Sequence, residues 1–203
     1  MANEIKGRII GAWMLQQEFR SPWKKVIIPL FLSFDDTNNL VSRGYGDNSV
    51  SRLNYSLSDK NLKLGDKINS EIEAITQKKL VLKINYEEYN YYRLFEKPTQ
   101  PDPNKLRMQL IKNKWSIGDN TYVFTNDPML NNNNSFELIE CRDGKKYFGS
   151  YFIDTFKNNL LLVLLVDGKY MEMVFKVVDN QGSVLKLETA SGKISELIQE
   201  GIS

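Results

Sequence analysis

Short segments with the alternation of half-buried strands recur along this 203-residue chain. In Val50–Leu57 the apolar side chains fall on alternate residues, as they do in a strand with one buried face. Turn-forming residues separate these segments, as in Asp35–Asn39. About eight such segments precede residue 97, at the regular spacing that is typical of a sandwich or a barrel. The sequence therefore predicts an all-β fold.

A proline-rich stretch interrupts this pattern near the middle of the chain. Lys97–Asn104 contains three prolines in a polar context, and proline cannot donate to the ladder of a central strand. We therefore predict a linker over residues 98–106, between a first domain at residues 1–97 and a second at residues 107–203. The length suits two small domains or one large one, at roughly 100–200 residues per domain.

The second half repeats the order of the first at three landmarks. These are Trp13 and Trp115, the segments Tyr55–Leu64 and Ile153–Leu162, and the segments Ile75–Lys83 and Val177–Leu187. A repeat in the same order favours two related domains, and turn chemistry shared by all β-proteins is the alternative explanation. The second choice of architecture is one larger β-structure whose halves share sheet edges.

Several local elements follow from composition. Glu4–Arg8 predicts a helical turn before the first tryptophan strand. Val26–Phe34 is rich in β-branched and aromatic residues and predicts a strand, with Pro29 at a bulge or an edge. Leu110–Ile117 predicts the strand of the second tryptophan. Asp167–Gly168 predicts a two-residue hairpin, because both positions tolerate positive φ.

Charge and cysteine content exclude several classes of protein. The net charge is +2, and the clusters of positive charge are only short pairs such as Lys24-Lys25, whereas nucleic-acid binding usually needs larger clusters. The single cysteine, Cys141, forms no intramolecular disulfide, which fits a reducing compartment. The longest apolar run, Leu160–Val166, is too short to span a bilayer. Met1–Arg8 lacks the pattern of a signal peptide. We expect a cytoplasmic protein with no nucleic-acid partner, or an exported one if a leader has been removed.

The chain contains no histidine, which removes the commonest general base and the commonest metal ligand. Asp35–Asp36 and Glu87–Glu88 are the best carboxylate pairs, but adjacent residues on a strand point to opposite faces. Turn formation and solvation are the roles that we assign to them. A calcium site at Asp35, Asp36 and Asn38 would need several more oxygens. We therefore predict no enzyme, no cofactor and no metal.

The first half carries an ordered set of motifs. They are Gly11-x-Trp13-x-Leu15, a Phe34–Asp36 turn, Tyr55-x-Leu57 before Asn61–Leu62, Ile72–Thr76 with Leu80-x-Leu82, and Tyr92–Lys97. This set, which covers nearly all of residues 5–97, resembles the small lipocalin-like (calycin) domains common in Bacteroidetes. The resemblance implies a compact antiparallel barrel of about eight short strands, closed by pairing of its ends. It also implies that Arg93 stacks on Trp13 by cation–π attraction.

The second half departs from this pattern. Asn113 stands two residues before Trp115, where the family has glycine. The position equivalent to Arg93 is predicted near Ser195 or Glu196, so that no cation would stack on Trp115. The predicted fold is therefore two tandem antiparallel lipocalin-like β-barrels, the second a divergent copy.

Four tyrosines are the candidate binding residues: Tyr86, Tyr89, Tyr91 and Tyr92. In a strand, Tyr89 and Tyr91 share one face and Tyr92 takes the other, so that one set faces outward or into a lumen. Tyrosine is enriched at protein interfaces, and packing within the sheet is the alternative. Trp13 and Trp115 could line a cavity, but we interpret them as core residues that close the barrel floors.

These observations predict a non-catalytic protein-binding module of the immunity or adaptor type, with a protein partner. The alternative is a carrier or sensor of a small hydrophobic ligand held in a barrel lumen. An eight-stranded barrel can hold a small ligand or be filled by side chains. Bulky residues assigned to the interior argue for filled barrels; they are Phe31, Tyr55, Phe152 and Phe175.

Overall fold

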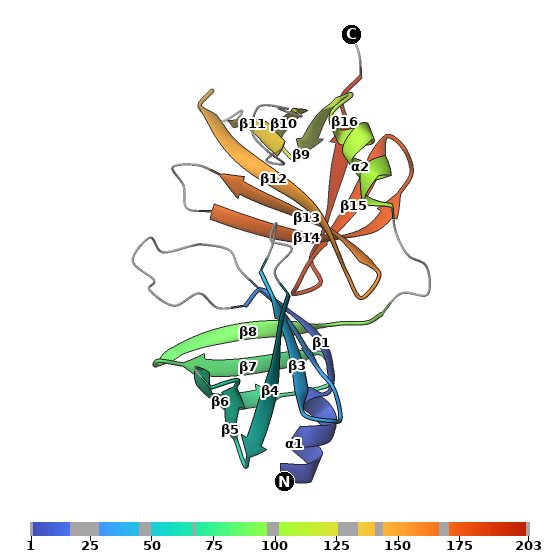
Figure 1. Ribbon diagram of the computed structural model, residues 1–203. Coiled ribbons are helices and arrows are strands. Elements are labelled where there is room, and N and C mark those ends of the chain that lie inside the picture. Colours follow the sequence, from blue (N-terminus) through green and yellow to red (C-terminus); the bar gives the residue numbers. More distant parts are fainter. Residues whose placement is uncertain are drawn as a thin grey trace. The chain divides into compact units, whose positions relative to one another are not determined.

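The computed structural model describes residues 2–16, 29–44, 50–66, 68–96, 102–125, 134–140, 144–166 and 171–201. Its described residues up to Glu96 form one compact unit, and those from Asp102 onward form another (Figure 1). Both units consist of antiparallel strands with one short helix each, so the all-β prediction is confirmed. No helix in the described ranges is long and apolar enough to cross a membrane.

The first unit is a closed barrel of eight strands that follow one another around its wall. Its elements are α1 (Ala2–Ile9), β1 (Gly11–Leu15), β2 (Phe31–Phe34), β3 (Asn39–Arg43), β4 (Val50–Ser58), β5 (Asn61–Leu64), β6 (Ile68–Ile75), β7 (Lys79–Ile84) and β8 (Glu87–Leu94). The last strand returns to the first, where Trp13 lies opposite Arg93. The predicted closure by pairing of the two ends is therefore present.

The second unit has the same succession of a helix and eight strands. Its elements are α2 (Pro103–Leu110), β9 (Lys114–Ile117), β10 (Asn120–Thr125), β11 (Asn134–Glu140), β12 (Lys146–Phe156), β13 (Asn159–Val166), β14 (Met171–Asn180), β15 (Val184–Thr189) and β16 (Ile194–Gln199). Its sheet closes between β16 and β9 through the pairs Ile198–Ser116 and Gln199–Trp115. This seam has two residue pairs, whereas the seam of the first barrel has four.

Helix α2 differs from the sequence prediction. It begins at Pro103, inside the predicted linker, and the second tryptophan strand begins at Lys114 rather than at Leu110. Asp102 caps the helix, because its Oδ1 accepts from the backbone N–H groups of Asn104 at 2.9 Å and Lys105 at 3.3 Å. Proline at the first helical position loses nothing, since its missing N–H would have had no partner. The prediction that Pro103 belongs to a linker is therefore wrong, because this proline begins a helix.

Other predicted elements fall partly outside the described residues. The strand predicted over Val26–Phe34 is present from Phe31, and Pro29 lies before it. Four predicted features lie outside the described ranges: residues 26–28 of the strand, residues 98–101 of the linker, Cys141 and the Asp167–Gly168 turn. The helical turn predicted over Glu4–Arg8 is part of α1.

In each barrel the tryptophan is tied to the helix that precedes it. The Trp13 indole N–H donates to the carbonyl of Ile9 at 2.7 Å, and the Trp115 indole N–H donates to Leu110 at 3.0 Å. Both side chains are fully buried. A helix leaves its last carbonyls without intrahelical partners, and a buried indole needs an acceptor. The bond satisfies both needs. It also fixes the helix against the end of the barrel that the tryptophan closes, which we call the floor.

Arg93 completes the floor of the first barrel. Its guanidinium lies 4.2 Å from the centre of the Trp13 ring. It donates from Nε to Gln77 O at 2.7 Å and from Nη1 to Ile10 O at 2.7 Å, and Nη2 donates to Arg8 O. Burial lowers the pKa of this guanidinium, which nevertheless stays charged at any physiological pH. One side chain therefore connects β8 to the end of α1, to β1 and to the β6–β7 turn.

The second barrel replaces this arrangement with two neutral amides. The residue opposite Trp115 is Gln199, so the predicted equivalence of Arg93 with Ser195 or Glu196 is wrong by a few residues. Gln199 Nε2 donates to Asn113 Oδ1 at 3.0 Å. Asn113 holds the place of Gly11, two residues before the tryptophan. The glutamine side chain is shorter than that of Arg93 and is uncharged, so that it leaves room for the Asn113 side chain.

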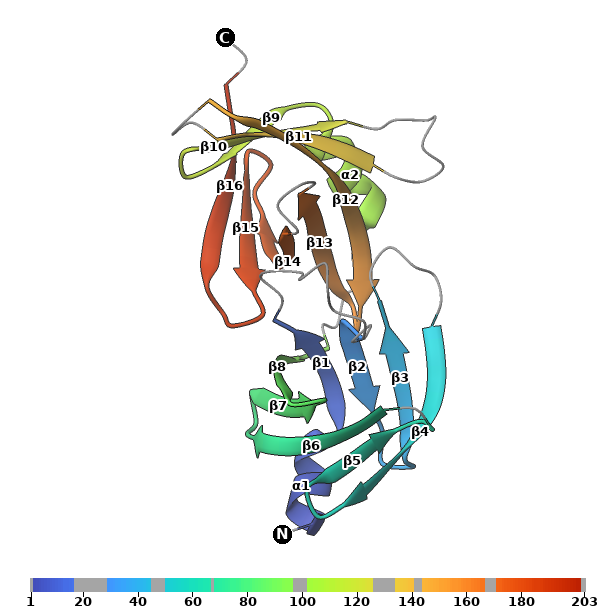
Figure 2. The ribbon, with the colours of Figure 1, turned by 90° about the vertical axis from the view of Figure 1, so that its left-hand side faces the viewer.

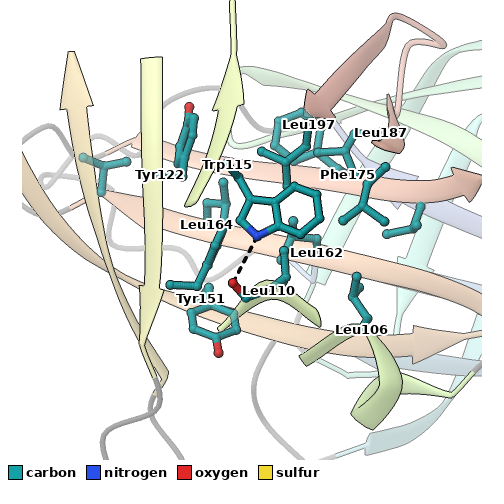
Figure 3. Close-up of a cluster of buried hydrophobic side chains, with 14 residues drawn as sticks. Leu106, Leu110, Trp115, Tyr122, Tyr151, Leu162, Leu164, Phe175, Leu187 and Leu197 are labelled. Atoms are coloured by element: carbon teal, nitrogen blue, oxygen red, sulfur yellow. Dashed lines mark hydrogen bonds between the residues drawn. The ribbon is translucent and has the colours of Figure 1, made fainter. Parts of the chain in front are cut away.

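Apolar side chains occupy the interior of the second barrel, and Figure 3 shows them around Trp115. The predicted interior position of Phe175 agrees with this cluster. The predicted interior positions of Phe31 and Phe152 are wrong. Phe31 lies opposite Met14 and Phe152 opposite Val163, which puts both on the wall faces that point away from the tryptophans. Both wrong assignments come from the parity of a strand, because a shift of one residue exchanges its faces.

Substitution of Gly11 tests the floor of the first barrel. An added Cβ would lie 2.5 Å from Arg93 Nη1, and Gly11 has φ of +125°. We expect Gly11→Ala to lower the free energy of unfolding by about 1–3 kcal/mol. Gly7→Ala is the matched control, because nothing lies within 4 Å of its added Cβ in α1. It should raise stability by about 0.5–1 kcal/mol. Urea denaturation measures both, and equal effects would contradict this account.

Candidate binding surface

The interior of the first barrel is apolar and filled by its own side chains. The inward-facing residues that are at most 4% exposed are Trp13, Leu15, Leu32, Phe34, Leu40, Tyr55, Leu62, Leu64, Ile72, Leu80, Leu82, Ile84 and Tyr91. Tyr55 packs edge-on against Phe34 with ring centres 5.0 Å apart, and its hydroxyl donates to Asp35 O at 2.7 Å. These contacts belong to a core rather than to a ligand site.

A surface pocket of about 340 Å³ opens on the second barrel. It lies where the α2–β9 turn, β10 and the end of β16 meet, and its walls combine Ile111, Val123 and Phe124 with Lys112, Lys114 and Glu200. Sites for small hydrophobic ligands are lined predominantly by apolar side chains. Three charged residues line this pocket together with three apolar ones, so its wall is mixed rather than predominantly apolar.

The four candidate tyrosines do not share one surface. Tyr89 and Tyr91 point into the barrel from β8 and are buried. The Tyr91 hydroxyl donates to Pro29 O at 2.9 Å, and the Tyr89 hydroxyl donates to Glu87 Oε2 at 2.6 Å. Burial raises the pKa of Tyr89 to about 12, and the pKa of Tyr91 rises further. Tyr92 is half-buried on the outer face, with Lys79 Nζ 6.0 Å from its ring centre.

Tyr86 differs from the other three because it lies at the tip of the β7–β8 hairpin. Its side chain is 95% exposed. Ile84 pairs with Glu87, so Asn85 and Tyr86 form a two-residue loop, with φ of 52° and 68°. Positive φ at both positions is the pattern of a type I′ turn, which prefers glycine at the second position. A bulky residue there is an outlier, and this hairpin therefore holds an exposed aromatic side chain at a cost in backbone strain.

The hairpin tip lies at the end of the first barrel opposite to its floor. The strands alternate in direction, so the β7–β8 turn shares this end with the start of β4 and with Gly65–Asp66 after β5. Glu87 and Glu88 follow Tyr86 directly and are exposed. Lys83, which lies opposite Glu88, forms an ion pair with Glu73 at 3.2 Å. We call Tyr86, Glu87 and Glu88 the tyrosine tip.

Asp35 organises the β2–β3 turn. Its Oδ1 accepts from the backbone N–H groups of Thr37 at 2.9 Å and Asn39 at 2.8 Å, and its Oδ2 accepts from Asn39 Nδ2 at 3.0 Å. These hydrogen bonds lower the pKa of the Asp35 carboxyl, and the bond from the Asn39 side chain has the largest effect. Within the described residues, no three acidic or cysteine side chains are grouped as a metal site requires. The carboxylate thus has the turn-forming role that the sequence predicts.

Tyr151 is a buried polar residue that the sequence did not single out. Its hydroxyl has no hydrogen-bond partner among the described residues. Burial raises its pKa to about 12, against the opposing effect of the Arg107 charge. Its ring packs edge-on against Phe124 at 5.1 Å. In Figure 3 the hydroxyl points away from Trp115. The sequence predicts only that Tyr151 lies in a β-strand.

Asp35→Asn is expected to destabilise the fold in a pH-dependent way. The folded-state pKa lies below the ordinary value of 3.8, so the stabilisation is complete above that pH and is lost as the pH falls through the folded value. The variant should therefore melt below the parent at neutral pH and approach it in acid. Asp36→Asn is the control. Thermal melts between pH 2 and 7 measure this, and a constant difference would contradict the assignment.

Two tyrosine-to-phenylalanine substitutions compare the loss of a hydrogen-bonded hydroxyl with the loss of one that has no partner among the described residues. We expect Tyr91→Phe to lower the free energy of unfolding by about 1 kcal/mol, because Pro29 O loses its donor. Tyr151→Phe should change it by less than about 0.5 kcal/mol or raise it. Denaturant unfolding compares the two variants. An equal loss for both would show that the Tyr151 hydroxyl has a partner, such as a buried water, in solution.

Comparison with known proteins gives no family for this chain: no protein-family model matches it, and a search of the curated proteins finds no match either. The resemblance to lipocalin-like domains therefore rests on the motifs of residues 5–97 and on the closed barrel that those residues form.

Proposed function

We propose that this chain is a non-catalytic binding protein of the immunity or adaptor type, built from two lipocalin-like barrels that arose by duplication. The common succession of one helix and eight antiparallel strands supports the duplication. The bond from each tryptophan indole to the end of the preceding helix supports it further. The differences at Asn113 and Gln199 fit a second copy that diverged.

The tyrosine tip is the observation that carries the proposed protein partner. Tyr86 is almost fully exposed and holds a left-handed backbone conformation that glycine would adopt without strain. Tyrosine supplies a large contact area at a small cost in conformational entropy, and it is common among the residues that dominate binding energy. Strain of this kind is retained where the side chain has a use.

A protein partner is favoured over a ligand in the lumen by the barrel interiors. Trp13, Tyr55 and Tyr91 bring aromatic bulk into the first barrel, and Trp115, Tyr122 and Phe124 do so in the second. A carrier would need a largely apolar cavity of roughly 300 Å³ or more. A small hydrophobic ligand that copurifies at one copy per chain would favour the carrier instead.

Tyr86→Gly is expected to weaken partner binding and to stabilise the chain. Loss of the aromatic contact should reduce affinity at least about tenfold, as for a dominant interface residue. Relief of strain should raise the free energy of unfolding by about 1 kcal/mol. The measurements are affinity capture from the native host, titration of the captured protein after its identification, and urea denaturation.

Lys157→Gly provides the matched control, because Lys157 also has positive φ, 50°, in a hairpin turn and is exposed. It should stabilise the chain similarly and leave partner binding unchanged. Unchanged affinity of the Tyr86→Gly variant would overturn the assignment of the tyrosine tip. Absence of any captured protein, together with a copurified ligand, would overturn the proposed function.

A further inference from the structure

The first half of β4 has a strand partner on one side. Val50–Asn54 pairs with β3 over the register Val50–Arg43 to Asn54–Asn39. On the other side, β5 pairs with Tyr55–Ser58. Figure 2 shows the start of β4 beside β3, with β5 lying farther along the strand. Among the described residues, no strand pairs with the other edge of Val50–Leu53, which we call the open edge.

Two hydrogen bonds establish which backbone groups face the open edge. Asn54 O accepts from Gly65 N on the β5 side at 2.8 Å, and Tyr55 N donates to Asn38 O on the β3 side at 2.8 Å. The N–H and C=O of successive residues point to alternate sides of a strand. The backbone groups of Val50 and Arg52 therefore point to the β5 side, beyond the reach of β5 itself. An edge of this kind is a template for an added strand.

The side chains around the open edge combine apolar surface with positive charge. Val50 is 45% exposed and Leu53 is 37% exposed. Arg52 is exposed and shares a face with Val50 and with Arg43 of β3. Two charges near this edge offset one another, because Lys63 of β5 lies 3.9 Å from Asp66, which follows β5. Arg52 therefore makes one face of the open edge basic, and Leu53 lies on the other face.

A second copy of the chain fits this edge poorly. Two-fold antiparallel pairing that uses the free groups of Val50 and Arg52 places the two Arg52 side chains opposite or diagonal to each other. Like charges in those positions are destabilising, and a charge on an edge strand is a common defence against self-pairing. The same charge favours a strand that carries carboxylates, so Arg52 discriminates between occupants.

We propose that the open edge of β4 binds an extended segment of the partner protein, with a carboxylate opposite Arg52 and apolar side chains on the face of Leu53. This inference rests on the proposed protein-binding function and specifies how the partner is held. The added strand would bond to the N–H and C=O groups of Val50 and Arg52. The tyrosine tip lies at the same end of the barrel and would supply a separate contact.

Two blocked seven-residue peptides test the proposal, one alternating valine and glutamate and the other alternating valine and lysine. The glutamate peptide should slow hydrogen exchange of the Val50 and Arg52 amides about tenfold when the edge is mostly occupied, because those N–H groups become bonded. The Ser51 and Leu53 amides, which face β3, should change little. The lysine peptide should bind about fivefold more weakly, as for an exposed charge pair. Amide-resolved NMR of the full chain measures each of these effects.

Variants of two exposed cations make the test specific. Arg52→Glu should reverse the preference, so that the lysine peptide binds more tightly than the glutamate peptide. Lys60→Glu, at the β4–β5 turn at the other end of the strand, should leave the preference unchanged. Equal binding of both peptides, or an unaltered preference in Arg52→Glu, would overturn the proposed charge recognition.

Two outcomes separate this inference from the proposed function. Protection of the Arg52 amide that grows with protein concentration without peptide would overturn the inference in favour of a second copy at the edge. A native partner whose binding depends on Tyr86 but is unaffected by Arg52→Glu would overturn the edge site and retain the protein-binding function.

Discussion

The hydrogen bond from a buried indole to the end of a helix is the interaction on which each barrel floor depends. An eight-stranded barrel has two open ends, and a helix laid across one end leaves its last carbonyls in a nonpolar place. Trp13 and Trp115 remove that cost by donating to Ile9 and Leu110. Because each tryptophan is on the first strand of its barrel, the same residue also joins the floor to the wall.

The two barrels differ in the residues that pack beside the floor tryptophan. In the first barrel, Arg93 donates to three backbone carbonyls and stacks on Trp13, which requires the absence of a side chain at Gly11. In the second, Gln199 lies opposite Trp115 and donates to Asn113, and the seam between the end strands is shorter. A neutral pair avoids the desolvation of a guanidinium, but it ties together fewer backbone segments.

The end of the first barrel opposite to its floor carries the two features to which we assign binding. There, Tyr86 is exposed in a strained turn, and the backbone of Val50 and Arg52 lacks a strand partner among the described residues. Neither feature contributes to the core. Features that cost stability or invite pairing, and that no core contact explains, are the ones most reasonably assigned to binding.

Local chemistry was sufficient to predict the all-β class, the strand content, the role of Asp35 in its turn and the shared face of Tyr89 and Tyr91. Alternation and turn composition act over a few residues, so a single sequence contains them. Which tyrosines face the interior, which residue lies opposite Trp115 and where β4 lacks a partner were decided by barrel closure. Closure pairs strands that are far apart in sequence, as Trp13 with Arg93, and a shift of one residue exchanges the two faces of a strand. That long-range register, and with it the candidate binding surface, exists only in the folded chain.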